Sequence, residues 1–411
     1  MKKCCKDIDI TDAYQIEPFI EECIKNHGKR HDFSVFIKKE GLINEYRQLL
    51  NGNISARYEI AIAIAKKIAT MIKARNIPVL KTWAKERYDD SSQKMRLIGN
   101  ETVLQRFLDY IVVYGCHELW HRKLVREQCS SIKGRGQLYG VKLLRKYILK
   151  DNQNMRWAVK HHIRYIRKCK YFVKLDIRHC YESIDKTILM NQLVHDIKNN
   201  DMVYLWKSLL GSYTDTTNGL LIGALPSQYA SQYIVANLYR KAMSNPSITH
   251  MATYMDDMIL FASNRRKLLK AVKALIVYAR DTLHLTIKSN FAIKKLENEP
   301  IDMMGYVLHA NGKITIRARG FIHARRLLLR YERQGYLTLS QSKRIVSYKG
   351  YFKQSNSYNS YARFNRAFRY AQKVISKHER NKQHGTSSNI IRNAAKNYIS
   401  ANGRRQSICH A

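Results

Sequence analysis

Two adjacent carboxylates, Asp256 and Asp257, interrupt an apolar run that spans residues 252–261. An apolar run broken at its centre by polar residues is typical of two strands joined by a tight turn. Such a turn would hold the two carboxylates together although like charges repel, so their proximity needs a reason. A divalent cation supplies one, because hard oxygen ligands suit Mg²⁺. An ordinary solvated turn is the alternative.

A second carboxylate closes a short apolar segment elsewhere in the chain. Residues 171–175 predict a strand, interrupted only by Lys174, and Asp176 follows at an end where a side chain can face a metal. Nucleotidyl transfer with two metal ions needs carboxylates from separate elements, with the ions about 3.5–4 Å apart. We therefore expect Asp176 and Asp256 to be catalytic carboxylates that bridge both ions, with Asp257 supporting them.

These carboxylates belong to a series of motifs that resembles the reverse transcriptases, and most closely the group II intron-like branch of that family. The resemblance covers roughly residues 90–360. Its motifs follow in the expected order at 94–98, 131–136, 175–177, 254–257, 303–306, 347–350 and 356–358.

The resemblance implies an α/β (α+β) fold with the right-hand architecture of polymerases. An antiparallel palm sheet would carry the metals, mainly helical fingers would precede it, and a basic helical thumb would follow. The expected regions are an N-terminal helical extension that starts the fingers at 1–88, the fingers at 89–168, the palm with inserted fingers-type helices at 169–310, and the thumb with a C-terminal tail at 311–411.

One segment departs from the usual family pattern. Most reverse transcriptases carry Gln-Gly-x-x-x-Ser-Pro beside the incoming nucleotide, whereas this chain carries Ile-Gly-Ala-Leu-Pro-Ser-Gln at 222–228. That form is similar to the reverse transcriptases of diversity-generating retroelements, in which the apolar residue is associated with error-prone copying opposite template adenines. Gln can hydrogen-bond the nucleotide but Ile222 can only pack, so discrimination between right and wrong pairs falls. A plain core role for Ile222 is the alternative.

The resemblance assigns further roles at the nucleotide site. The backbone carbonyl of Ile177 would be another metal ligand. Tyr181 would lie beneath the sugar and favour deoxynucleotides because it clashes with a ribose 2′-hydroxyl, and core packing is its alternative role. Ile222 and Gly223 would line the site beside the incoming nucleotide.

Three cations also match nucleotide-binding positions of the family. Lys94 and Arg96 match fingers residues that hold the triphosphate, where they would offset the charge that develops on the leaving pyrophosphate. Lys288 matches a lysine that protonates pyrophosphate. On a chain this basic, a surface charge is the alternative role for each of them.

Three residues match template or primer contacts. Arg135 lies in a Gly-Arg-Gly turn from which it would reach the template or the triphosphate. Gly305 and Tyr306 resemble the primer-grip hairpin, where glycine permits a tight approach of the backbone.

Composition points to a polyanionic partner. The formal net charge is +41, from 73 Lys and Arg against 32 Asp and Glu, and such a chain is expected to bind nucleic acid with a strong salt dependence. Residues 311–411 hold many Lys and Arg interleaved with Tyr but only Glu332 and Glu379 as acids, which favours backbone contacts and base stacking. No Asp follows Asp302, so we expect no appended carboxylate-dependent nuclease.

Two other classes of partner and site are not expected. No run of about 18 apolar residues occurs and the start of the chain is too polar for an export signal, so we expect no membrane partner. The eight cysteines include no Cys-x-x-Cys pair, which argues against a zinc ribbon. Scattered cysteines are typical of the reducing cytoplasm, where we expect this protein.

The prediction is an RNA-directed DNA polymerase that adds dNTPs to a DNA or RNA primer on an RNA template with two Mg²⁺ ions, for which Mn²⁺ would substitute. The resemblance implies mutagenic retrohoming, in which a template-repeat RNA is copied into adenine-mutated cDNA that diversifies a target gene. It also implies a small basic accessory protein, usually a pentamer. Two alternatives stay open: a reverse transcriptase of the antiphage-defence, retron or group II intron type, and a maturase-like RNA-binding protein.

Overall fold

The computed structural model describes residues 3–78, 82–89, 94–213 and 216–380. The chain divides into two compact units, Met1–Glu299 and Pro300–Ala411. The second unit starts before the thumb predicted at 311, because the small sheet at 301–316 groups with the helices that follow it. Each unit is described by itself.

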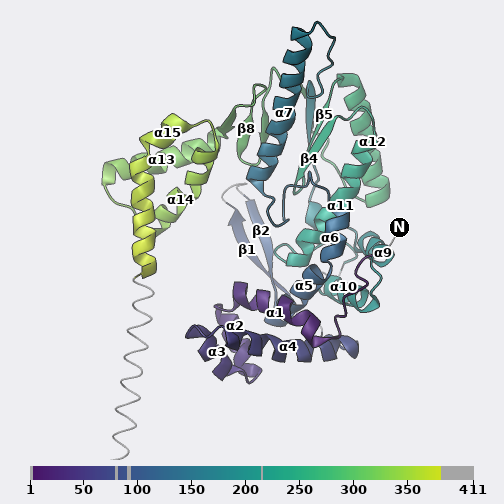
Figure 1. The fold of residues 1–411 in the computed structure, drawn as a ribbon, viewed down its shortest axis with the longest axis vertical. Coiled ribbons are helices and arrows are strands. Elements are labelled where there is room, and N and C mark those ends of the chain that lie inside the picture. The colour runs from purple at the N-terminus through teal and green to yellow at the C-terminus, as the bar shows by residue number, and fades with distance from the viewer. Residues whose placement is uncertain (1–2, 79–81, 90–93, 214–215, 381–411) are drawn as a thin grey trace, which may run out of the picture. The chain divides into compact units, whose positions relative to one another are not determined.

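Unit 1 opens with four helices (Figure 1), namely α1 (Ala13–His27), α2 (His31–Lys39), α3 (Ile43–Leu50) and α4 (Ser55–Lys73). Helix α4 is rich in Ile and Ala, whose side chains are buried along most of its length. Helix α1 packs against both α4 and α5.

The rest of unit 1 alternates helices with short strands. In chain order these are β1 (Trp83–Asp89), β2 (Lys94–Asn100), α5 (Val103–Gly115), α6 (His117–Lys123), α7 (Gln137–Lys160), β3 (Tyr171–Asp176), α8 (Cys180–Ser183), α9 (Lys186–Asp196), α10 (Asn200–Tyr213), α11 (Leu225–Met243), β4 (His250–Tyr254), β5 (Asp257–Ala262), α12 (Arg265–Leu283) and β6 (Ile293–Lys295). Residues 101–129 and 186–209 each contain two helices rather than one, α5 with α6 and α9 with α10.

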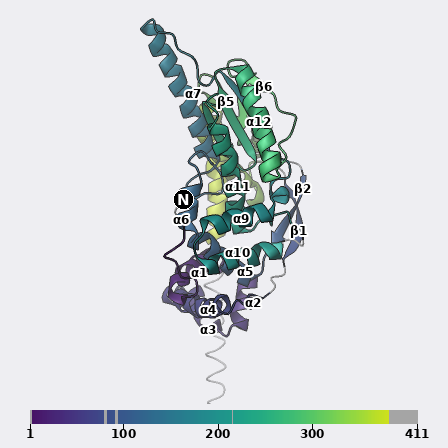
Figure 2. The same cartoon turned by 90° about the vertical axis from the view of Figure 1, so that its right-hand side faces the viewer.

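A four-stranded antiparallel sheet in the order β4-β5-β3-β6 forms the centre of unit 1. Residues Met258–Ala262 of β5 are all buried, which requires cover on both faces of the sheet. Helices α7 and α11 pack against β4, and α12 packs against β5 and β6 (Figure 2). The strand pair predicted at 252–261 is confirmed as β4 and β5.

Unit 2 begins with a three-stranded antiparallel sheet and continues as helices. Its elements are β7 (Ile301–Met303), β8 (Tyr306–Leu308), β9 (Ile314–Ile316), α13 (Ala318–Gln334), α14 (Leu339–Gln354) and α15 (Tyr358–Arg363), and residues 365–380 are also helical. The unit has its own apolar core, to which α13, α14 and the last helical residues contribute Leu328, Ile345, Phe352 and Phe368. Within the described residues, no helix is long and apolar enough to cross a bilayer.

Candidate active site

Strands β3 and β5 bring the three predicted carboxylates together. Asp176, the last residue of β3, lies opposite Asp257, the first residue of β5, and Asp256 occupies the turn that precedes β5. The backbone N–H of Ile177 donates to the Asp256 carbonyl at 3.1 Å, so the chain continues beside the turn after β3 ends. The hairpin turn and the strand end therefore meet at one edge of the sheet.

The turn itself consists of Met255 and Asp256, and Met255 has φ 54°. A left-handed residue at the first position is typical of the two-residue hairpin turns that match strand twist. The Met255 N–H donates to Ser130 Oγ at 2.7 Å. This bond fixes the strained backbone from outside the hairpin, and it joins segments that lie 125 positions apart in the sequence.

Residues 127–129 pair with β4 as a further short stretch of extended chain. Thr253 donates its N–H to the Glu127 carbonyl at 3.0 Å, and Cys129 donates to the Thr253 carbonyl at 2.9 Å. The Gln128 amide is fully buried and donates to the Gln232 carbonyl of α11 at 2.6 Å. Sequence reasoning missed Gln128 and Ser130, because no local pattern reveals contacts between such distant segments.

Burial controls the electrostatics of the paired aspartates. It raises the pKa of Asp256 and of Asp257 above the ordinary carboxyl value, and the Asp176 carboxylate adds to both shifts. Positive charges oppose these shifts: Lys288 and Arg96 lower the pKa of Asp256, and Lys174 lowers that of Asp257. The site is thus a concentration of negative charge that draws cations.

Two lysines neutralise the carboxylates. Lys288 Nζ lies 2.5 Å from Asp176 Oδ1, and its backbone N–H also donates to the Asp176 carbonyl at 2.9 Å. Lys174 Nζ lies 2.9 Å from Asp257 Oδ2. Sequence reasoning singled out Lys288 but treated Lys174 as an interruption of the strand. Lys174 lies two residues before Asp176, so both side chains lie on the same face of β3. This spacing could have predicted that Lys174 belongs to the site.

The donor set fits divalent cations in its chemistry. Asp176 Oδ1 is buried, and Lys288 Nζ is its ion-pair partner in the described structure. Across the described ranges, no three His, Cys, Asp or Glu side chains are gathered closely enough around one point to hold a metal as they stand. The ions would be held by the carboxylate oxygens of Asp176, Asp256 and Asp257 and by the carbonyl oxygen of Ile177, after the lysine side chains move away.

Tyr181 follows the first carboxylate on the short helix α8. Burial raises its pKa, and the neighbouring hydroxyls of Ser231 and Ser131 lower it. The Tyr181 carbonyl accepts from the Leu220 N–H at 2.8 Å, which ties α8 to the segment that carries Ile222. The phenol therefore lies between α11 and the loop before α7, close enough to Asp256 for that carboxylate to affect its pKa.

The Ile222–Gly223 segment packs directly on strand β2. Gly99 of β2 donates its N–H to the Ile222 carbonyl at 2.7 Å. A Cβ on Gly99 would lie 2.3 Å from Leu221 Cδ1, and one on Gly223 would lie 3.2 Å from the Gly99 carbonyl. Gly223 also has φ +112°, a conformation that side chains disfavour. Two glycines thus permit a close contact between β2 and the segment expected beside the nucleotide.

The predicted cations of the fingers lie on the same strand. Arg96 is exposed in the middle of β2, and its charge lowers the pKa of Asp256. Arg96 is thus near enough to Asp256 to act on its charge, and its predicted contact with the triphosphate stays a prediction. Lys94 begins β2, and its side chain lies outside the described residues.

Arg135 closes its own loop. Its guanidinium donates to the Val125 carbonyl at 2.6 Å, and its backbone N–H donates to the Ile132 carbonyl at 2.9 Å. The structure therefore shows a loop-holding contact for this side chain, and its role towards template or triphosphate stays a prediction.

Gly305 and Tyr306 belong to unit 2. Met304 and Gly305 form the turn between β7 and β8, both with positive φ, as primed two-residue turns require. A Cβ on Gly305 would lie 2.9 Å from Tyr351 Cε1, and the Tyr306 and Tyr351 rings lie 5.0 Å apart between centroids. Glycine thus permits a close approach here, as expected for a primer-grip hairpin, and the primer contact itself stays a prediction.

Comparison with known protein families identifies the family of this chain. Residues 84–308, more than half of the chain, match the family described as reverse transcriptase (RNA-dependent DNA polymerase). The chain belongs to the reverse transcriptase family. The matched range of this reverse transcriptase includes Asp176, Asp256 and Asp257, the three aspartates predicted to be catalytic. Together with the antiparallel sheet covered by helices, it confirms the expected α/β polymerase fold.

The solved structures that are similar to this chain are only distantly similar. The reverse transcriptase is similar to apo telomerase from Candida tropicalis truncated from its C-terminal domain, with 11% identity and a TM-score of 0.40 over 58% of this chain and 55% of that chain. It is also similar to telomerase from Candida albicans in complex with a fragment of telomeric RNA, with 10% identity and a TM-score of 0.44 over 74% and 61% of the two chains. The chain thus spans little more than half the length of the first of these telomerases. A comparison with curated proteins finds no match.

Proposed function

We propose that the chain is an RNA-directed DNA polymerase. The observation that carries this proposal is the pairing of Asp176 with Asp257 on adjacent strands, with Asp256 in the turn between β4 and β5. The reaction would join a primer 3′-oxygen to the α-phosphate of a dNTP and release pyrophosphate. Bound divalent ions, Mg²⁺ or Mn²⁺, would lower the pKa of the primer hydroxyl and stabilise charge on the leaving group.

The surrounding side chains have matching roles. Lys288 and Arg96 hold positive charge beside the carboxylates, where it would stabilise the triphosphate and the departing pyrophosphate. Lys288 Nζ would move from Asp176 to the phosphates when ions neutralise the carboxylate. Tyr181 of α8, whose phenol lies between α11 and the loop before α7, would exclude ribonucleotides by contact with the 2′-hydroxyl.

The finer proposal is error-prone copying of a template-repeat RNA. It is supported by Ile222, which has no polar side-chain group and whose backbone is tied to β2 through Gly99. With the backbone fixed, an apolar side chain packs against the nucleotide without reading its geometry. The small basic pentameric accessory protein and the cytoplasmic location remain parts of this proposal, and the seven described cysteines, all free, agree with a reducing compartment.

Primer extension on an RNA template tests both the polymerase proposal and the error-prone copying proposal. The protein is incubated with primer, dNTPs and Mg²⁺, with and without any small basic protein encoded beside it, and the cDNA is sequenced. Substitutions concentrated opposite template adenines support the retroelement proposal, and Ile222→Gln is expected to reduce them several-fold. If the wild-type protein makes faithful cDNA, the polymerase proposal would stand. The diversification proposal would then be rejected in favour of another reverse transcriptase lineage. No synthesis in either condition would favour the maturase-like alternative.

A further inference from the structure

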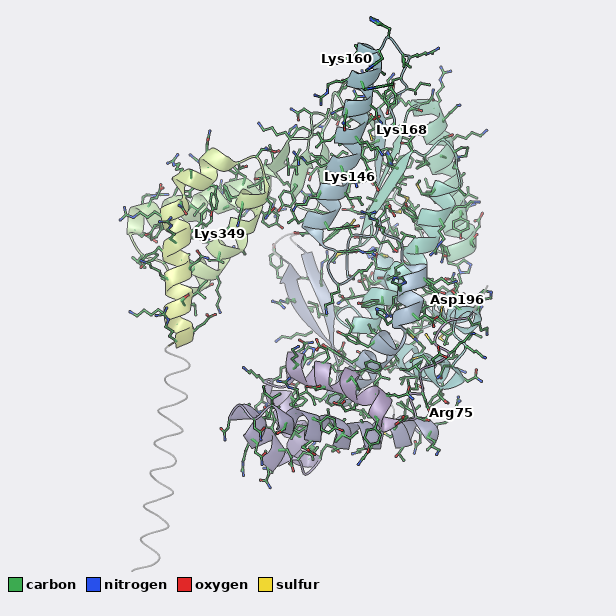
Figure 3. The ribbon with its side chains drawn as sticks, viewed as in Figure 1. Arg75, Lys146, Lys160, Lys168, Asp196 and Lys349 are labelled. Atoms are coloured by element: carbon green, nitrogen blue, oxygen red, sulfur yellow. The ribbon has the colours of Figure 1, made fainter. Side chains whose placement is uncertain are left out.

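Helix α7 carries a continuous line of positive charge that the polymerase site does not use. At 3.6 residues per turn its exposed basic residues fall within an arc of about 140°, which places them on one face of the helix. These residues, here named the basic stripe, are Lys142, Arg145, Lys146, Lys150, Arg156 and Lys160. The stripe is about 27 Å long, at 1.5 Å per helical residue. Figure 3 shows Lys146 and Lys160 along α7, and Lys168 on the segment that follows it.

The far end of α7 adds exposed apolar and aromatic groups to this charge. Trp157 is 55% exposed and stacks on His161, with ring centroids 4.3 Å apart. Ile163 and Ile166, in the segment that returns to β3, are 53% and 64% exposed. Large side chains gathered at one exposed tip are typical of a surface that meets a partner.

This tip is held in place rather than loose. The carboxylate of Asp151, the one acidic residue between 137 and 170, is buried under the returning segment. It accepts from the Tyr165 hydroxyl at 2.9 Å and from the Lys168 N–H at 2.8 Å, and Arg167 Nε lies 3.5 Å away. Because the sole acid is used internally, the outer face is uniformly positive and preorganised.

The tip lies away from the catalytic turn. Tyr147, in the middle of α7, stacks on His250 at the start of β4, with centroids 4.2 Å apart. From there β4 runs towards Met255, whereas α7 continues for about 20 Å in the other direction to Lys160. Binding at the tip would therefore leave the polymerase site free.

We propose that the basic stripe and the Trp157–His161 stack bind a structured RNA, with the phosphates of a stem along the stripe and an unpaired base on the exposed ring. Repeated cations fit the phosphate backbone, and aromatic stacking fits bases outside a helix. The choice of RNA as the polyanion rests on the proposed function, and the RNA bound here would be a folded part of the template RNA. Uniform positive charge disfavours a basic protein as the occupant.

The test measures binding of a fluorescently labelled RNA hairpin with unpaired nucleotides at its end. The combined variant Lys146→Glu, Lys150→Glu and Arg156→Glu is expected to weaken binding at least ~10-fold and to reduce the slope of log affinity against log salt by about three. The matched control reverses Arg266, Lys270 and Lys273, three exposed cations of α12. Trp157→Ala is expected to weaken binding of this hairpin ~5-fold or more, and to spare a blunt duplex.

The controls separate this proposal from the polymerase itself. All variants are expected to keep the wild-type Tm and wild-type extension of a short primer–template. Equal losses in the α7 and α12 variants would overturn the proposal, because only general charge would then matter. Unchanged hairpin affinity in the α7 variants would overturn it in favour of a protein partner at Trp157. Hairpin binding needs no catalysis, so failure of polymerization would refute the proposed function alone.

Discussion

At the scale of single residues, the site depends on carboxylates whose charge is opposed by specific lysines. Asp176 and Asp257 each have an ammonium group within 3 Å in the described structure. Buried like charges are costly unless they are paired or coordinate cations. The lysines therefore offset the carboxylate charge in the described structure, and under the proposed function release of Lys288 to the phosphates would link substrate binding to ion binding.

Replacement of Asp256 by Asn is expected to abolish polymerization, with a loss of at least ~10³-fold, because the amide cannot supply the charge that the ions require. The rate of primer extension measures this. Asp281→Asn is the control, since Asp281 is exposed and pairs only with its neighbour Arg280 among the described residues. Activity in Asp256→Asn close to that of the control would contradict the assignment of the metal site.

Gly223→Ala is expected to impair the nucleotide segment. The φ of +112° strains any residue with a side chain, and the 3.2 Å approach to the Gly99 carbonyl makes a methyl group a tight fit; such strain costs about 1–3 kcal/mol. We expect a raised KM for dNTPs with a smaller change in overall stability. Gly136→Ala, where a Cβ has no neighbour within 4 Å and φ is negative, is the control. A wild-type KM in Gly223→Ala would show that the segment does not touch the nucleotide.

At the scale of elements, α5 carries a buried polar cluster behind the nucleotide segment. Gln105 and Asp109 lie one turn apart on α5, and their side-chain atoms have no hydrogen-bond partner in the described structure. Tyr213 at the end of α10 and Ser227 at the start of α11 are buried beside them, and the Ser227 hydroxyl lies close enough to the Tyr213 phenol to lower its pKa, which burial raises. Burial raises the pKa of Asp109 well above its usual range, and raises that of Glu101 to about 7. The cluster therefore favours a protonated Asp109.

This cluster predicts a pH dependence of stability. A raised carboxyl pKa means that the folded protein holds a proton that the unfolded chain releases, so stability is highest below the unfolded pKa and falls as pH rises towards the folded value. Each such proton contributes a slope of about 1.4 kcal/mol per pH unit. We expect the free energy of unfolding of the wild type to fall from pH 5 to pH 7, and that of Asp109→Asn to fall less. Denaturant titrations across this range measure it. Parallel pH profiles would mean that Asp109 is ionised when folded.

The elements around the site were largely predictable, whereas their contacts were not. The strand ending at Asp176 and the hairpin at Asp256 have local signals, since apolar runs and turn residues follow from neighbours in sequence. The Ser130 bond to Met255 and the contact of Gly99 with Ile222 have none. They join residues more than 100 positions apart, and only the packed structure shows which pairs meet.

At the scale of the whole molecule, the charge dominates behaviour with nucleic acid. A net charge of +41 is spread over both units, and residues 311–411 carry 22 Lys and Arg with two acids. We expect the affinity for RNA to fall roughly 10³-fold or more between low and physiological salt, because several phosphate contacts release counterions. Fluorescence anisotropy over a salt series measures the slope. An affinity insensitive to salt would contradict phosphate contacts as the main source of binding.

The Ser130 bond to the catalytic turn also has a consequence for how the protein is made. The turn at Met255 is held by a residue far upstream, while Asp176 and the β6 pairing join it from intervening and later segments. Contacts of such long sequence separation form late, because the chain must close large loops first. A nascent chain that emerges as far as Asp257 therefore lacks part of the assembled site, and under the proposed function copying of RNA would begin only after the ribosome has delivered nearly all of unit 1.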